Sequence, residues 1–348
     1  MWMEIRVGWM VWKTRIVRNN IPMNLSFAGG ATRWCHLLVV GLALAGCASI
    51  GPPTAPTAPV VAPVQAPSAS LPVAKAPARI GLALGGGAAR GFAHVGVIQV
   101  LEEAGIRPDM VVGTSAGSLV AALYASGRNG AQLQQVAESL EEAALTDWTL
   151  PIFGRGALKG EALARYVSSL VNHKLIEEMP MPLGIVATDL GSGQGVLFRR
   201  GSTGTAVRAS SAVPSVFQPV TIAGRDYVDG GLVSPVPVGF ARQMGADLVI
   251  AVDIASPPEG QATGDSLQIL LQTFAIMSKS INRFELKEAD VVVRPALAGV
   301  KSADFTAKRR SIEAGRRAMQ QALPQLRAEM AAAQSQYKPK SKNPAQGR

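Results

Sequence analysis

The residues best suited to chemistry in this chain surround a serine in the stretch Val111–Ser118. Ser115 stands in a Gly-x-Ser-x-Gly pattern, between a short apolar run ending at Val112 and a helix-forming run that begins at Leu119. This strand–turn–helix context is typical of a nucleophile elbow, where a sharp turn exposes the serine hydroxyl. Gly113 and Gly117 let the strand and the helix close on each other, because neither glycine carries a Cβ atom. The pattern therefore indicates Ser115 as the nucleophile of a covalent mechanism.

A serine hydroxyl is a poor nucleophile until a positioned base takes its proton. Asp229 is the better candidate for that base, since Gly230 and Gly231 follow it and allow its backbone to approach the serine. His94 lies in the helix expected after a glycine-rich turn, where we expect it to pack against neighbouring elements. A Ser115–His94–Asp triad acting on small soluble esters stays an alternative.

The glycine-rich turn reads Gly85-Gly86-Gly87-Ala88-Ala89-Arg90-Gly91 and follows a first apolar run, Ile80–Leu84. Such a turn between a strand and a helix could hold a phosphate group on its N–H groups. However, it lacks both the Gly-Lys-Ser/Thr ending of a P-loop and the glycine spacing of a dinucleotide site. We expect Arg90 either to hold this loop through an ion pair or to bind a substrate phosphate.

These three motifs, in this order, resemble the patatin-like phospholipase family in its bacterial branch, over roughly residues 79–298. A proline-containing block, Ala209-Ser210-Ser211-Ala212-Val213-Pro214, adds to the resemblance. The resemblance implies hydrolysis of phospholipid, lysophospholipid or related lipid esters by a dyad, with Ser115 as nucleophile and Asp229 as base. The other alternative is a lipoprotein that keeps the fold only to bind lipid or a partner, and the intact dyad argues against it.

The resemblance also implies an oxyanion hole in the glycine turn, at Gly85, Gly86, Gly87 and Ala88, where losing one donor costs about 3–4 kcal/mol of transition-state stabilisation. The turn is one residue longer than in plant members, so the sequence leaves open which two amides point inward. The residues expected to support these motifs are Arg90, Gly91, Gly113, Gly117, Gly230 and Gly231.

The positioning elements alternate between strands and helices, which predicts an α/β fold with three α/β/α layers and a mostly parallel sheet covered on both faces. Strands are expected at 80–84, 109–112, 183–188, 248–253 and 291–293, and helices at 131–144, 160–172, 203–211 and 265–287. We expect no metal and no other cofactor. The sequence has no His/Cys cluster, and the Gly191–Gly195 turn lacks the carboxylate spacing of a calcium loop.

Residues 1–46 are predicted to be a lipoprotein signal peptide, whose true start is more naturally Met23 than Met1. An apolar run over 36–46 is too short to span a bilayer comfortably and ends in Leu44-Ala45-Gly46-Cys47. That ending resembles a lipobox, which implies cleavage before Cys47 and acylation of this residue. Because Ala48 follows, the resemblance implies sorting to the outer membrane, facing the periplasm. Residues 47–78 form a Pro/Ala-rich linker.

Residues 299–333 are predicted to be a C-terminal helical extension, with Ile312, Met319 and Leu326 at helical spacing, and residues 334–348 a basic disordered tail. The whole chain carries a formal charge of +10, and its last 50 residues hold 11 basic and 3 acidic side chains. Either this region is simply well solvated, or it draws the domain toward anionic lipid. We expect no nucleic-acid partner, since an exported enzyme would rarely meet one.

Overall fold

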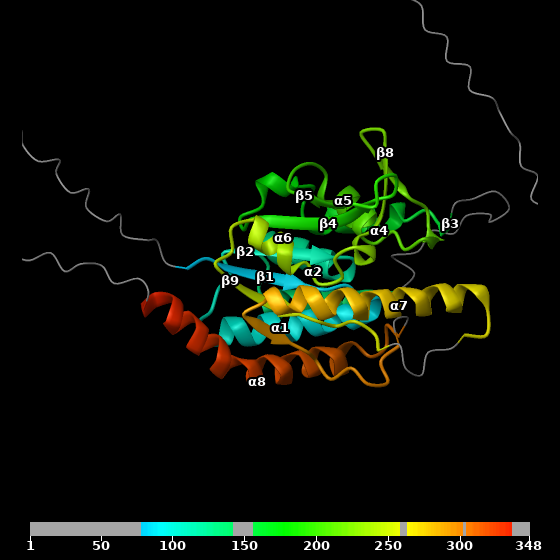
Figure 1. Cartoon of the computed structure of the whole chain (residues 1–348). Coiled ribbons are helices and arrows are strands. Elements are labelled where there is room, and N and C mark those ends of the chain that lie inside the picture. The colour runs from blue at the N-terminus through cyan, green and yellow to red at the C-terminus, as the bar shows by residue number, and fades with distance from the viewer. Residues whose placement is uncertain (1–77, 142–155, 258–262, 302–303, 336–348) are drawn as a thin grey trace, which may run out of the picture. The chain divides into compact units, whose positions relative to one another are not determined.

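A mixed sheet of eight strands positions the serine and the aspartate (Figure 1). The computed structural model describes residues 78–141, 156–257, 263–301 and 304–335, which lie in one compact unit, Ser70–Arg348. The strand order is β10-β9-β1-β2-β4-β8-β7, and β5 also pairs with β4. The strands are β1 (Ile80–Leu84), β2 (Met110–Thr114), β4 (Leu183–Asp189), β5 (Gly195–Phe198), β7 (Val220–Ile222), β8 (Arg225–Asp229), β9 (Leu248–Val252) and β10 (Val291–Val293). A separate parallel pair joins β3 (Gly156–Leu158) to β6 (Ser215–Phe217).

Strands β10, β9, β1, β2 and β4 pair in parallel with one another. Strands β5 and β8 pair antiparallel with β4, and β7 pairs antiparallel with β8. Every residue of β1, β2, β4 and β9 is buried. Continuous apolar strands of this kind occur where helices cover both faces of a parallel sheet. Leu84 lies opposite both Gly113 and Val252, so the carboxyl ends of β1, β2 and β9 meet at one edge. The predicted α/β fold with a mostly parallel sheet is confirmed.

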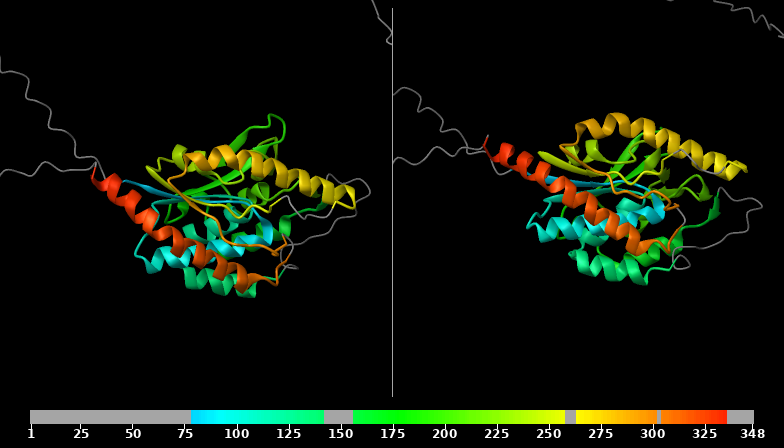
Figure 2. Two further views of the ribbon diagram at one scale, coloured as in Figure 1. Left: turned by 60° about the horizontal axis from the view of Figure 1, so that its bottom comes forward. Right: turned by 90° about the horizontal axis from the view of Figure 1, so that it is seen from below.

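Side chains that alternate along the strands divide the core between the two faces of the sheet. Leu82 and Leu84 pack in the larger cluster, and Ala83 packs in the smaller one, where α6 contributes Val238 and Ala241. Figure 2 shows α7 across the sheet from α1 and α8. The helices are α1 (Phe92–Glu103), α2 (Ala116–Ala125), α3 (Gly130–Ser139), α4 (Glu161–Leu170), α5 (Thr203–Ser210), α6 (Val238–Gln243), α7 (Ser266–Glu285) and α8 (Lys308–Ser335). Short 3-10 turns include η1 (Ala88–Gly91), η3 (Ile176–Glu178), η4 (Gly230–Leu232) and η5 (Leu286–Glu288).

The C-terminal helix α8 packs against α1 with the two backbones in contact. A Cβ atom on Gly96 of α1 would lie 1.9 Å from the carbonyl oxygen of Ile312 on α8. A Cβ atom on Gly315 of α8 would lie equally close, 1.9 Å, to the carbonyl oxygen of Ala93 on α1. Met319 of α8 is fully buried in the larger cluster. The helix expected as an extension beyond residue 298 is therefore part of the core of this unit.

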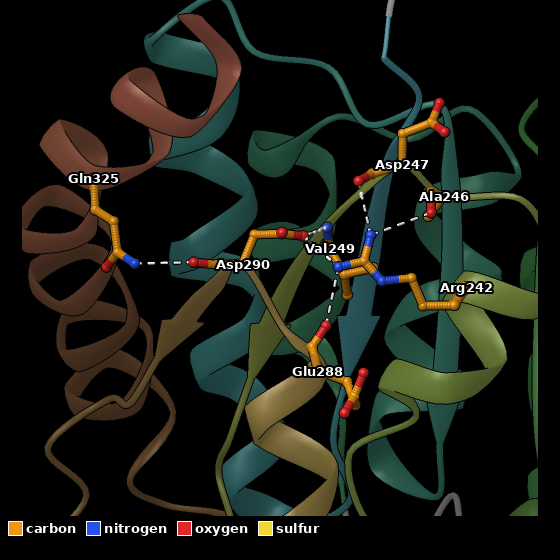
Figure 3. A network of polar contacts seen from close by, with 7 residues as sticks. All are labelled: Arg242, Ala246, Asp247, Val249, Glu288, Asp290 and Gln325. Atoms are coloured by element: carbon orange, nitrogen blue, oxygen red, sulfur yellow. Dashed lines mark hydrogen bonds and ion pairs between the residues drawn. The ribbon is translucent and has the colours of Figure 1, made fainter. Parts of the chain in front are cut away.

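A polar network at the amino end of β9 joins four elements of the unit (Figure 3). Arg242, the last basic residue of α6, donates to the carbonyl oxygens of Asp247 at 2.7 Å and of Glu288 at 3.0 Å. It also donates to the Asp290 carboxylate at 2.7 Å, and that carboxylate accepts from the backbone N–H of Val249 at 2.6 Å. Gln325 of α8 donates to the carbonyl oxygen of Asp290 at 2.9 Å. The network fixes the carboxyl end of α7, through η5, to the sheet.

Candidate active site

Ser115 sits at the carboxyl end of β2 and caps the amino end of α2, in a strained backbone conformation. Its φ of 52° and ψ of −122° lie outside the regions that non-glycine residues usually adopt. Strain of this kind persists only where the surrounding structure enforces it, and it clusters at active sites. A Cβ atom on Gly117 would lie 2.1 Å from the carbonyl oxygen of Leu84, and one on Gly113 would lie 2.4 Å from that of Gly117. The turn therefore requires glycine at both positions, as the sequence indicates.

Asp229 ends β8, which pairs with β4 so that Asp229 lies opposite Ala187. Its side chain is almost fully buried, and its Oδ1 atom accepts a hydrogen bond of 2.7 Å from the backbone N–H of Gly231. The hydroxyl of Thr188 donates to the Asp229 carbonyl oxygen at 2.8 Å. A Cβ atom on Gly230 would lie 2.3 Å from the carbonyl oxygen of Val186, so only glycine fits there. Both the side-chain carboxylate and the main-chain carbonyl group of Asp229 are thus held in place.

The environment of Asp229 raises the pKa of its carboxyl group to about 6. Burial is the main cause, because it disfavours the charged form. The N–H of Gly231 and the side chain of Ser115 lower the pKa and partly offset this effect. The interaction with Ser115 brings the two predicted dyad members together across 114 residues of sequence. A carboxyl group with a pKa near neutrality is well matched to take a proton from a hydroxyl.

Ser210, at the end of α5, holds Ser115 in place through the backbone of Ser115. Its buried hydroxyl accepts a hydrogen bond of 2.8 Å from the N–H of Ser115 and donates one of 2.5 Å to the carbonyl oxygen of Val186. The sequence places Ser210 in the proline-containing block, but it gives no reason to assign this role. The role depends on a contact between residues 95 positions apart, which no local pattern encodes.

The glycine-rich turn runs beside the nucleophile, since a Cβ atom on Gly86 would lie 3.2 Å from the Cβ of Ser115. Two of its four candidate amides are already used: Gly85 donates to Val252 at 3.0 Å, and Gly86 donates to Pro235 at 2.9 Å. The N–H groups of Gly87 and Ala88 have no acceptor among the residues that the structure describes. The geometry therefore leaves these two amides available to an oxyanion.

His94 is fully buried in α1 and supports the glycine-rich turn. Its Nε2 atom donates to the carbonyl oxygen of Gly85 at 2.8 Å, and its Nδ1 atom has no hydrogen-bond partner in the described structure. Burial lowers the pKa of His94 to about 4, so the ring is neutral at physiological pH. The ring contacts the loop rather than Ser115, which matches the packing role expected for it.

Arg90 is also buried, with 5 % of its surface exposed, and its charge faces that of Asp253. Burial lowers the pKa of the guanidinium, and the Asp253 carboxylate partly counteracts this change. The Nε atom of Arg90 has no hydrogen-bond partner among the described residues, and both roles expected for Arg90 stay predictions. Gly91 packs η1 onto α2, since a Cβ atom there would lie 2.9 Å from the Cβ of Ala116.

Other features of the described residues do not add to the site. No group of three or more His, Cys, Asp or Glu side chains in this part of the chain is arranged to hold a metal ion. A cavity of about 760 Å³ is lined by Ile176, Pro182 and Leu183 at the amino end of β4. It therefore opens at the edge of the sheet opposite to Ser115. Among the same described residues, no helix has the length and apolar character needed to cross a membrane.

Residues 82–242 match the patatin-like phospholipase family. An uncharacterized NTE family protein of Mycobacterium tuberculosis is 39 % identical over 185 residues, which cover 53 % of this chain and 51 % of that protein. Patatin-like phospholipase domain-containing protein 6 of Homo sapiens is 34 % identical over 233 residues, which cover 64 % of this chain and 16 % of that protein. The chain thus spans about half, or less, of the length of these curated relatives.

The solved structure of VipD from Legionella pneumophila has a similar fold, with a TM-score of 0.50. The similarity covers 71 % of this chain and 67 % of that one, at 17 % sequence identity. It agrees with the family match in fold, and the family match spans both members of the predicted dyad.

Proposed function

We propose that this chain, whose residues 82–242 match the patatin-like phospholipase family, is a membrane-tethered serine hydrolase of lipid esters. The observation that carries the proposal is the pairing of Ser115, on a strained elbow, with the buried carboxyl group of Asp229. The family match and the similarity to NTE family proteins support a lipid ester as the substrate. The substrate class is phospholipid, lysophospholipid or a related ester.

In the proposed mechanism, the ionised Asp229 takes the proton of the Ser115 hydroxyl as its oxygen attacks the ester carbonyl. The N–H groups of Gly87 and Ala88 stabilise the negative oxygen of the tetrahedral intermediate. Asp229 then returns the proton to the leaving alcohol, and an acyl-enzyme ester remains on Ser115. Water, deprotonated by the same carboxylate, hydrolyses this ester and restores the free serine. The hydrogen bond from His94 Nε2 to the carbonyl oxygen of Gly85 supports a dyad over the triad alternative.

The dyad is tested by hydrolysis of a chromogenic ester and of phospholipid vesicles. Ser115→Ala and Asp229→Asn should each abolish turnover while the far-ultraviolet circular dichroism stays that of the folded protein. The double variant should be no worse than either single one, because the two residues act as a unit. A His94→Gln variant that is as inactive as Ser115→Ala, yet folded, would replace the dyad with the triad.

The tethering part of the proposal depends on Cys47, which lies outside the described residues, as do the linker and the last 13 residues of the basic tail. We propose that the chain is acylated at Cys47 and held at the outer membrane, facing the periplasm. Two or more acyl chains give stable anchoring, where a single chain gives only marginal binding. Cys47→Ser should leave the precursor uncleaved and unlabelled by radioactive palmitate. A mature protein found in the soluble periplasmic fraction and starting elsewhere would contradict the proposal.

A further inference from the structure

Helix α7 carries most of the exposed large apolar side chains of the described structure. Seven such side chains are exposed, and five of them belong to α7: Leu267, Ile269, Leu271, Ile276 and Phe284, with exposed fractions between 44 % and 68 %. Scattered apolar residues are normal on a protein surface, but a concentration on one element marks an interaction site.

The amino-terminal part of α7 is apolar on opposite sides. No charged residue occurs between Asp265, which caps the helix, and Lys279, a span of 13 residues and about 20 Å of helix. Ile269 and Leu271 are two positions apart, so they point about 200° away from each other, yet both are exposed. Figure 1 shows this end of α7 extending past the strands of the sheet. A one-sided protein groove would cover only one of these side chains, whereas a bilayer would surround both.

Basic side chains follow directly after the apolar span. Lys279 and Arg283 lie four residues apart and form a basic stripe near the end of α7, and Lys287 follows in η5. Arg283 also lines, with Arg294, a cavity of about 280 Å³ between α7 and the carboxyl end of β9. Arg294 pairs with Asp253 there at 3.4 Å. An apolar helix that ends in a basic stripe is complementary to the interface of an anionic bilayer, with acyl chains below and phosphates above.

The same helix is joined to the catalytic loop. The ring of Phe274 would be 3.9 Å from a Cβ atom on Gly231, whose N–H holds the Asp229 carboxylate. Near the other end of α7, the hydroxyl of Ser234 donates to the carboxylate of Glu285. The carboxyl-terminal end of α7 is thus bound to the domain through Glu285, whereas large apolar side chains of the amino-terminal half are exposed. A surface that binds the amino-terminal half would therefore lie next to the site, because Phe274 lies beside Gly231.

We infer that α7 inserts its amino-terminal half into the acyl–headgroup boundary of an anionic phospholipid bilayer and thereby delivers lipid to Ser115. The inference builds on the proposed lipid-ester hydrolysis but concerns a different element from the acylated cysteine and the basic tail. It places Ile269 among acyl chains and Arg283 at the level of the phosphates.

The test places a fluorescent probe on the helix in the full chain. Cys35→Ser, Cys47→Ser and Ser115→Ala remove the native thiols and hydrolysis, and Ile269→Cys supplies one site for an environment-sensitive label. The matched control is Leu175→Cys, an exposed leucine between α4 and η3, on the segment that leads into the amino end of β4. With phosphatidylglycerol/phosphatidylcholine vesicles, the probe at 269 should shift to the blue and be quenched by nitroxide-labelled acyl chains. The probe at 175 should do neither.

A second arm uses the active enzyme with Leu267→Gln, Ile269→Gln and Leu271→Gln combined. Its rate on vesicles should fall at least about tenfold, while its rate on a soluble monomeric ester stays unchanged. If the probe at 269 shows the same emission and lack of quenching as the probe at 175, the inference is overturned even if the enzyme hydrolyses lipid. Shielding of the probe without vesicles, together with a dimer in sedimentation, would overturn it in favour of a second copy. If the wild-type chain cleaves neither ester, the proposed function fails, while the probe still decides the docking.

Discussion

Replacing Asp229, the proposed base, should make the protein more stable at alkaline pH, because the folded state holds this residue in an environment that resists its ionisation. Burial raises the pKa of this carboxyl group from 3.8 to about 6. Each pKa unit corresponds to 1.36 kcal/mol, so the ionised carboxylate costs the native state about 3 kcal/mol relative to the unfolded chain.

The sign of the pH dependence follows from the two protonation equilibria. Below the unfolded-state value of 3.8 the carboxyl group is protonated in both states, and its ionisation costs nothing. Between pH 3.8 and about 6 the folded state binds more protons than the unfolded state, so stability declines across this range and levels off above it. The amide side chain that Asp229→Asn introduces would not ionise. The stability of Asp229→Asn minus that of the wild type should therefore increase by about 2–3 kcal/mol between pH 4 and pH 8.

The assay is urea denaturation of both proteins at a series of pH values, followed by circular dichroism. Taking the difference removes other titrating groups, including Glu285, whose pKa burial raises to about 7. Ser115→Ala is a control for which the stability difference should change in the opposite direction. It removes an interaction that lowers the pKa of Asp229, so it should reduce the free energy of unfolding more at pH 8 than at pH 4. A difference between wild type and Asp229→Asn that does not vary with pH would refute the reasoning. In the active enzyme, kcat/KM should rise with pH through about 6 as the base ionises.

Three further substitutions, with a fourth as a control, test the supports of the site and of the core. His94→Gln should lower the free energy of unfolding, measured by urea denaturation, by about 1–3 kcal/mol, because it disturbs a buried hydrogen bond to the glycine turn. It should still retain measurable ester turnover. Ser210→Ala should lower kcat about tenfold with little change in KM, since the main-chain N–H of the nucleophile loses its acceptor; an unchanged kcat would remove its positioning role. Gly96→Ala should destabilise the fold by about 1–3 kcal/mol or more, measured by urea denaturation, because the new methyl group collides with the backbone of α8. Gly239→Ala in α6, where nothing lies within 4 Å of the added atom, should instead be neutral or stabilising.

Local rules were enough to predict the candidate pair, Ser115 and Asp229, and most of the fold. The glycines on either side of Ser115 are dictated by collisions within one turn, so they are visible in a short stretch of sequence. The apolar runs of β1 and β9 likewise indicate strands covered on both faces, wherever those strands lie in the sheet. The helix expected over 131–144 ends at Ser139, five residues early, and such boundaries depend on contacts beyond the helix itself.

Only the tertiary structure decided the pKa of Asp229 and which amides of the glycine-rich turn are available. The pKa of Asp229 depends on burial by elements that are distant in sequence, and burial is a property of the packed chain. The choice between four candidate amides depends on Val252 and Pro235, which take the hydrogen bonds of Gly85 and Gly86. The packing of α8 in the core depends on Gly96 of α1, where any Cβ atom would collide with the backbone of α8. The sequence around Gly96 does not show that another helix crosses there. Sequence specifies what each segment can do, and long-range contacts specify which of those possibilities the folded molecule uses.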